Sequence, residues 1–177
     1  MTYTFDEPRI GMLQVAQLDV GYTTANGTAL AIPTPPTALG SVVRAFDPTY
    51  GEGEFICLKG VASTKVGSIV IWDGTTFQTT LAAATQFQGR PIAVAMSACL
   101  AVNYGWYQIG GTAVAAKGTA RIQPTVAVGV STTGLIGNVN SGIQILGSRS
   151  ANAATVLTAV TTVSLVLDRP HLQGRIT

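Results

Sequence analysis

The chain has 177 residues, of which 47% are hydrophobic and 10% are charged, and its formal net charge is +2. Ordinary soluble domains carry roughly 25% charged residues, so uncharged polar side chains must cover the exterior, or part of it must be buried against other subunits. The basic residues are scattered singly and the best apolar run, residues 91–102, contains Ser97, which argues against direct nucleic-acid binding and against a membrane-spanning helix.

Residues 1–39 are predicted to form an extended N-terminal arm or linker. Pro33, Pro35 and Pro36 lie within four positions, and this density of proline excludes a helix or a central strand. It favours an extended, polyproline-like backbone. Such an arm can add main-chain hydrogen bonds to the sheet edge of a neighbour; a flexible terminus without a role is the alternative.

Residues 40–177 are predicted to form one all-β domain, a compact β-barrel or β-sandwich. Runs of β-branched residues alternate with Gly, Asn, Asp and Pro, which is typical of short strands joined by turns. Asp73 and Gly74 predict a hairpin, because glycine tolerates the positive φ of a tight turn. Residues 82–85 and 151–157 allow at most a short helix. The strands expected in chain order are 41–46, 54–59, 67–72, 77–81, 92–96, 105–109, 113–116, 125–130, 143–146 and 160–167.

The residues that usually carry catalysis or bind metals are sparse. A hydrolase triad or an acid–base pair usually needs a histidine near a carboxylate and a nucleophile, and the single histidine, His171, follows the last predicted strand. Cys57 and Cys99 lack the CxxC spacing of a zinc site or a disulfide framework, so we expect buried free thiols. The sequence therefore predicts no catalytic residue, no metal and no cofactor.

Two carboxylates, Glu52 and Glu54, lie on one face if their segment is extended. They form either a solvated acidic edge or a polar contact to a positively charged partner surface, with a catalytic pair as the remaining alternative. The flanking glycines, Gly51 and Gly53, do not complete a phosphate-binding GxGxxG fingerprint, because position 56 is Ile56.

Three aromatic residues, Tyr104, Trp106 and Tyr107, lie together in one predicted strand. Side chains alternate along a strand, so Tyr104 and Trp106 share one face and Tyr107 lies on the other. This division, without an adjacent basic cluster, argues against a stacking platform for single-stranded nucleic acid. We expect these rings to pack in the core or at a subunit interface.

Several segments carry a more specific pattern. Residues 41–56 combine an Arg–aromatic–Asp-Pro sequence with Gly-Glu-Gly-Glu leading into a strand, and further matching segments are 58–61, 93–98 and 104–111. Taken together, they resemble the capsid decoration (cement) proteins of tailed bacteriophages. The resemblance extends over about residues 41–116.

This resemblance implies a non-enzymatic protein that adds to the outside of a phage head, binds the major capsid protein and stabilises contacts between its subunits. The resemblance also implies localisation in the virion. Synthesis in the host cytoplasm is expected because the acidic N-terminal residues and the lack of an apolar run there do not suggest a secretory signal. Self-association is expected, as a trimer with a dimer as the alternative. The predicted contact residues are Pro33, Pro35, Pro36, Asp47, Tyr50, Glu52, Glu54, Tyr104, Trp106 and Tyr107.

Two other function classes remain open. A receptor- or glycan-binding module on the virion surface would need the aromatic side chains of Trp72, Trp106 and Tyr107 to face solvent. An enzyme, such as a lyase or hydrolase fragment, would need His171 in a cleft beside a carboxylate.

Overall fold

The computed structural model describes residues 3–6, 15, 18–19, 37–84, 89–101, 103–139 and 142–173. Within these residues the chain forms twelve β-strands and no helix, which confirms the predicted all-β class. The strands are β1 (Thr4–Phe5), β2 (Leu18–Asp19), β3 (Val42–Asp47), β4 (Gly51–Lys59), β5 (Ile69–Trp72), β6 (Thr79–Leu81), β7 (Ile92–Ala95), β8 (Tyr104–Ala116), β9 (Ala127–Val130), β10 (Ile136–Gly137), β11 (Gln144–Ser150) and β12 (Thr162–Leu172).

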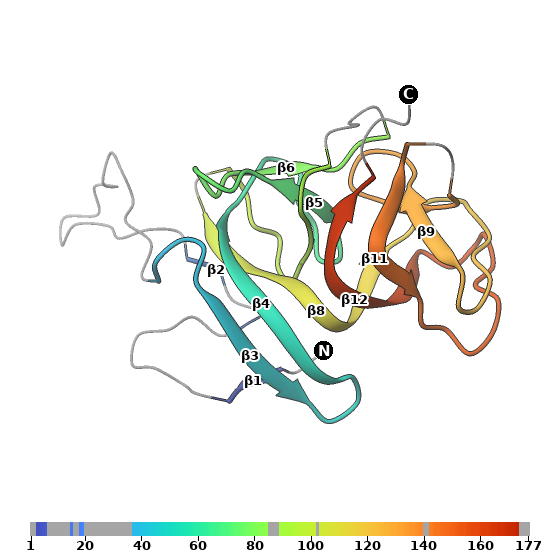
Figure 1. Cartoon of the computed structure of the whole chain (residues 1–177), viewed down its shortest axis with the longest axis horizontal. Helices are drawn as coiled ribbons and strands as arrows, with labels where there is room; N and C mark the ends of the chain where they lie inside the picture. Colours follow the sequence, from blue (N-terminus) through green and yellow to red (C-terminus); the bar gives the residue numbers. More distant parts are fainter. Residues whose placement is uncertain are drawn as a thin grey trace.

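All twelve strands belong to one antiparallel sheet, in the order β1-β3-β4-β8-β12-β11-β9-β10 (Figure 1). A branch leaves this path at β8, which also pairs with β7, and β7 continues to β5 and β6. The sheet is not closed into a barrel, so a sandwich or open β-fold fits the structure and the barrel alternative does not.

Strand β8 is the longest element, with 13 residues, and it joins the two halves of the sheet. Its first part pairs with β4, and its second part pairs with β12. We expected two separate strands divided by Gly110 and Gly111. The strand instead continues through them, because Gly111 adopts a φ of +82° beside a register shift opposite Glu54 and Phe55, and this bulge bends the strand without ending it.

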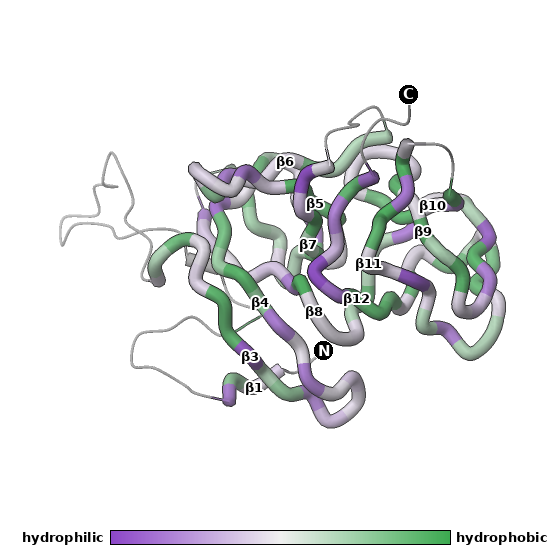
Figure 2. Tube along the Cα trace, in the orientation of Figure 1, coloured by the Kyte–Doolittle hydropathy of each residue, from purple (hydrophilic) through white to green (hydrophobic). Residues whose placement is uncertain are grey.

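The buried side chains form three clusters. Figure 2 shows that hydrophobic and hydrophilic stretches both occur along the strands. The largest cluster is aliphatic and lies among β5, β7 to β12 and their loops; it contains residues such as Ile71, Val94, Ile145, Val163 and Leu165. The aromatic cluster consists of Tyr3, Phe5, Val15, Ala45, Phe55, Cys57, Met96 and Trp106. The middle cluster consists of Ile56, Leu58, Val70, Ala93, Ala95, Cys99, Tyr107 and Ile109.

The described part of the predicted arm lies against the chain's own sheet. Strand β1 pairs with β3, and Tyr3 and Phe5 are buried in the aromatic cluster. The Phe5 ring meets Trp106 edge-on at 5.5 Å between centroids, and the Tyr3 hydroxyl donates to the Thr112 carbonyl at 2.8 Å. Most of residues 1–39, including the three prolines, lies outside the described residues.

The hairpin predicted at Asp73 and Gly74 is confirmed, with β5 and β6 as its strands. Asp73 Oδ1 accepts hydrogen bonds from the backbone N–H groups of Thr75 and Thr76, both at 2.9 Å. Hydrogen bonds to a carboxylate favour its charged form, so they lower the pKa of Asp73. The short helix considered for residues 151–157 does not form.

Candidate functional site: the hairpin face

The β3–β4 hairpin is held by the turn that joins its strands. Asp47 Oδ1 accepts hydrogen bonds from the N–H groups of Thr49 and Tyr50, at 2.8 and 3.1 Å, and Gly51 follows with a φ of +77°. Asp47 is buried, and Tyr50 is partly buried against the aromatic cluster. Both residues therefore shape the turn, and the Asp47 side chain offers a partner little surface.

The two sides of β3 differ in burial. Val43 and Ala45 pack on the aromatic cluster, whereas Val42, Arg44 and Phe46 are exposed, as the alternation of side chains along a strand requires. On β4, the residues opposite the exposed three are Ile56, Glu54 and Glu52. We call this side of the hairpin, with the adjoining end of β12, the hairpin face: Val42, Arg44, Phe46, Glu52, Glu54, Ile56, Asp168, Arg169 and Pro170.

Ion pairs cross the hairpin face between strands. Arg44 lies 3.4 Å from Glu52 and 3.5 Å from Glu54, and the Arg169 Nε donates to Glu54 Oε2 at 3.3 Å. The side chains of Arg44, Glu52 and Arg169 are more than half exposed, so each pair contributes only about 0–1 kcal/mol to stability. The pairs mainly orient the charged groups, and Glu54 sits between two guanidinium groups.

A charged groove of about 340 Å³ lies between the ion pairs and β12. Gly53, Gly110 and Gly111 are among the residues that line it. A Cβ atom at Gly110 would lie 3.2 Å from Glu54 Cβ, and one at Gly111 would clash with the Glu52 carbonyl oxygen. Glycine at positions 110 and 111 therefore permits the close approach of β4 and β8 beside the groove.

An apolar pocket of about 230 Å³ adjoins this groove. Arg169 lines both spaces and has a φ of +40°, a conformation that L-residues rarely adopt. The pocket lies at the base of the hairpin, where β3 and β4 meet β5, β7 and β8. The remaining residues that line it are Val42, Ile56, Trp72, Pro91, Ile92, Ile109 and Pro170.

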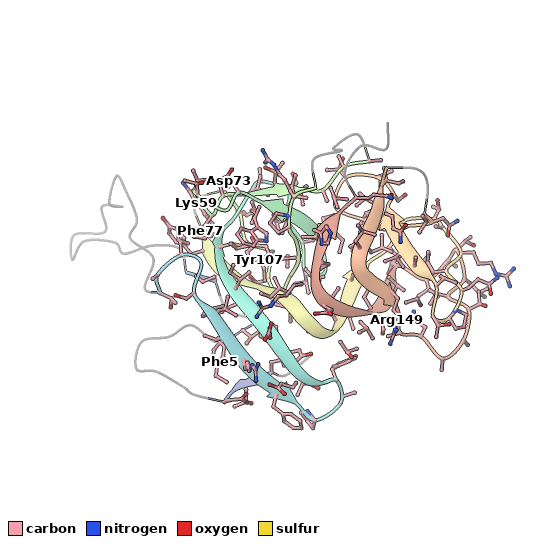
Figure 3. All side chains as sticks on the ribbon, in the orientation of Figure 1. Phe5, Lys59, Asp73, Phe77, Tyr107 and Arg149 are labelled. Atoms are coloured by element: carbon pink, nitrogen blue, oxygen red, sulfur yellow. The ribbon has the colours of Figure 1, made fainter. Side chains whose placement is uncertain are left out.

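A third hollow of about 350 Å³ continues past Asp168 toward Arg149 on β11. Figure 3 shows Arg149 on the side of the molecule formed by β11 and β12. Positive and negative groups are balanced along the groove and this hollow, with three of each sign. They are Arg44, Arg149 and Arg169, and Glu52, Glu54 and Asp168.

The aromatic residues predicted as contact sites lie in the interior of the chain. Tyr104, Trp106 and Tyr107 are 5%, 1% and 0% exposed. Trp106 belongs to the aromatic cluster and Tyr107 to the middle cluster, which confirms that strand alternation divides these rings between two environments. Their interface role is corrected for the same reason: with both faces of this part of β8 covered, the side chains fill the core and present no surface to a partner.

The residues considered for catalysis are not brought together. His171 is exposed on β12, Cys57 and Cys99 are buried free thiols, and Glu52 and Glu54 are each paired with arginine. In the described part of the chain, no three His, Cys, Asp or Glu side chains form a metal-binding group. That part also has no helix with the length and apolar character needed to span a membrane.

Sequence reasoning found Glu52 and Glu54 but missed their arginine partners and the exposed apolar residues beside them. Arg44 could have been found by pairing residues 41–46 with 51–56 across the predicted turn. Arg169 had no local signal, because only the topology brings β12 next to β4 through β8. No family model, curated protein or solved structure matches this chain.

Proposed function

We propose that this chain is a structural protein that binds the outer surface of a phage head, associates with itself and stabilises contacts between major capsid protein subunits. The main support is the position of the segments that resemble decoration proteins. Residues 41–56 supply β3 and most of β4, and the later blocks supply β7 and the first part of β8. These strands are neighbours in the sheet, and Figure 1 shows β3, β4 and β8 side by side. The resemblance therefore covers one continuous part of the fold.

The surface of this part suits contact with another protein better than chemistry on a small molecule. Its charged groove and apolar pocket are open, and Glu52 and Glu54 are engaged by arginine. Exposed Val42 and Phe46 add apolar area to the same side of the hairpin. Apolar area with a polar surround is typical of protein–protein contacts.

The glycan-binding alternative has less support. It needed three aromatic side chains in solvent, but Trp106 and Tyr107 are buried. Trp72 alone of the three lines an open pocket, and that pocket is apolar rather than rich in the hydrogen-bonding groups that hold a sugar. An enzyme would need His171 in a cleft, and this side chain lines none of the three hollows described above.

Electron cryo-microscopy of expanded shells, assembled from the major capsid protein of a tailed phage, tests the proposal. Shells incubated with the chain should show regular extra density at symmetry positions and a higher melting temperature than shells alone. Shells that are correctly expanded yet show no added density would reject the decoration role.

A matched pair of variants tests the predicted role of the hairpin turn in shell binding. Thr49 and Thr133 are both exposed residues in turns, on different parts of the chain. We expect Thr49→Arg to weaken shell binding about tenfold or more, a change of ~1.4 kcal/mol, and Thr133→Arg to bind as the unmodified chain does. Equal binding by both variants would remove the turn from the shell contact.

A further inference from the structure

We propose that the hairpin face is the surface through which copies of this chain associate, and that Phe46 of one copy enters the apolar pocket of the next. This inference rests on the self-association that forms part of the proposed function, and it names the surface and the residues involved. It follows from an exposed ring, a pocket that the ring fits, and a balanced pattern of charge between them.

Phe46 is the projecting group. It is 53% exposed, and it is the one aromatic side chain among the large apolar residues that the described part of the chain exposes. It lies on the same side of β3 as Val42, at the pocket rim, but four residues away. Strands rise about 3.3 Å per residue, so roughly 13 Å separate Phe46 from the rim of its own pocket. The ring can therefore reach such a pocket only on another molecule.

The apolar pocket is suited to an aromatic ring. Its volume of about 230 Å³ exceeds the ~150 Å³ of an apolar cavity that binds benzene. Trp72 and Arg169 are among the residues that line it, and indole and guanidinium groups interact favourably with a phenyl ring. Moving Phe46 from water into this pocket would contribute to association through burial of its apolar area.

The charges favour another copy as the occupant. A face dominated by one sign of charge repels its own copy, whereas a face with alternating, balanced charges can oppose arginine to carboxylate when two copies meet. The groove beside the pocket has this balance, with Arg44 and Arg169 interleaved with Glu52, Glu54 and Asp168, and Arg149 beyond. Because one face carries both the ring and the pocket, a two-fold pair makes the contact twice, and a three-fold ring makes it once for each neighbouring pair.

The first experiment is sedimentation velocity over a series of protein concentrations with Phe46→Ser and a matched control, Leu157→Ser. Leu157 is 56% exposed and is not part of the hairpin face. We expect the control to associate as the unmodified chain does, and Phe46→Ser to need about tenfold or more protein for the same association. Both variants should keep the melting temperature of the monomer, since both side chains are exposed. A monomeric unmodified chain, or unchanged association of Phe46→Ser, would overturn the proposal.

A disulfide experiment locates the contact. Chains carrying Val42→Cys are mixed with chains carrying Phe46→Cys under mild oxidation; the native Cys57 and Cys99 are buried, and the unmodified chain shows their background. Because the Phe46 position of one copy should lie at the Val42 rim of another, we expect mixed disulfides to exceed both homodimers. Mixed disulfides no more abundant than homodimers would contradict the predicted placement.

Shell binding separates this inference from the proposed function. If Phe46→Ser associates normally but loses shell binding, the face belongs to the shell contact, and the inference fails while the decoration role stands. If the ring and pocket contact is found but the unmodified chain adds no density to expanded shells, the inference stands and the decoration role fails. Loss of self-association by Phe46→Ser with retained shell binding supports both.

Discussion

The aromatic cluster and the aliphatic cluster are built from different side chains. All twelve Phe, Trp and Tyr residues lie at or before Tyr107, and four of them form the aromatic cluster beneath the β3–β4 hairpin. The aliphatic cluster, among β5 and β7 to β12, contains no aromatic ring. Figure 3 shows labelled Phe5 and Tyr107 on the side of β1 to β8, and Arg149 on the side of β11 and β12.

The two clusters use different side chains because different amounts of each region's surface are buried. The β3–β4 hairpin packs one side on the cluster and leaves the other as the hairpin face, so few residues must supply its burial. Large rings suit this position, because each buries about 150–250 Å². The other half contributes short apolar side chains from many strands, and Val, Ile, Leu and Ala at alternating positions are enough to fill its interior.

Acidic residues are also distributed unevenly along the chain. Residues 74–167 contain no Asp or Glu, so a buried cation there has no carboxylate of this stretch to pair with. Lys117 is such a cation, and its Nζ donates to the carbonyl oxygens of Gly118 and Ala120 at 2.8 and 2.7 Å. The hairpin face instead carries ion pairs, in which Glu52 and Glu54 lie beside Arg44 and Arg169.

The largest expected effect on the free energy of unfolding comes from truncating a large buried side chain in the aromatic or the aliphatic cluster. Trp106→Ala should lower the free energy of unfolding by about 3–5 kcal/mol and Leu165→Ala by about 2–5 kcal/mol, because each leaves a cavity in a fully buried site. Urea unfolding followed by circular dichroism measures both losses. A loss below ~1 kcal/mol for Trp106→Ala would contradict the anchoring role of the aromatic cluster.

The same titration tests whether the halves unfold together. Trp72 lies on β5 and Trp106 on the first part of β8. Their fluorescence therefore reports mainly on the strands up to β8, whereas circular dichroism reports on the whole sheet. In Leu165→Ala, where both tryptophans remain, the two signals should share one midpoint, because β8 belongs to both halves. A separate fluorescence midpoint would show two units that unfold independently.

A smaller effect is expected at the bulge that joins the halves. Gly111 and Gly51 both have positive φ, but a Cβ at Gly111 would clash with the Glu52 carbonyl, whereas one at Gly51 meets nothing within 4 Å. Alanine in this conformation costs about 1–2 kcal/mol. We therefore expect Gly51→Ala to lose about that amount and Gly111→Ala clearly more, measured by chemical unfolding. Equal losses would mean that the bulge relaxes around the added methyl group.

Much of the fold could be predicted from local patterns. Runs of β-branched residues marked most strands to within a few positions, and Asp73 with Gly74 marked a hairpin. The errors arose where distant contacts decide the outcome. Two-residue strands such as β1 and β10 are too short for a periodic signal, and β8 continues through two glycines because β4 and β12 supply its hydrogen bonds.

Less of the candidate site than of the fold could be predicted from the sequence. Glu52 and Glu54 were singled out because they lie two residues apart, whereas Arg169 reaches Glu54 across 115 positions of sequence. Trp106 and Tyr107 were expected in the core or at an interface, and sequence alone does not show that both faces of β8 are covered by the same chain. Pro33, Pro35 and Pro36 lie outside the described residues, so their predicted contact role stays a prediction.

The smallest expected effect is a difference in alkaline sensitivity, and it concerns the buried tyrosines Tyr3 of the aromatic cluster and Tyr107 of the middle cluster. Burial raises the pKa of Tyr107 and of Tyr3 above the ordinary value near 10. Above about pH 10 the unfolded chain therefore loses these protons before the folded chain does, and the stability that the protonated side chains contribute is lost as pH rises. Tyr107→Phe should show a shallower loss of stability than the unmodified chain between neutral and alkaline pH, measured by urea unfolding at each pH. Identical pH profiles would mean that the buried hydroxyl reaches solvent before the sheet opens.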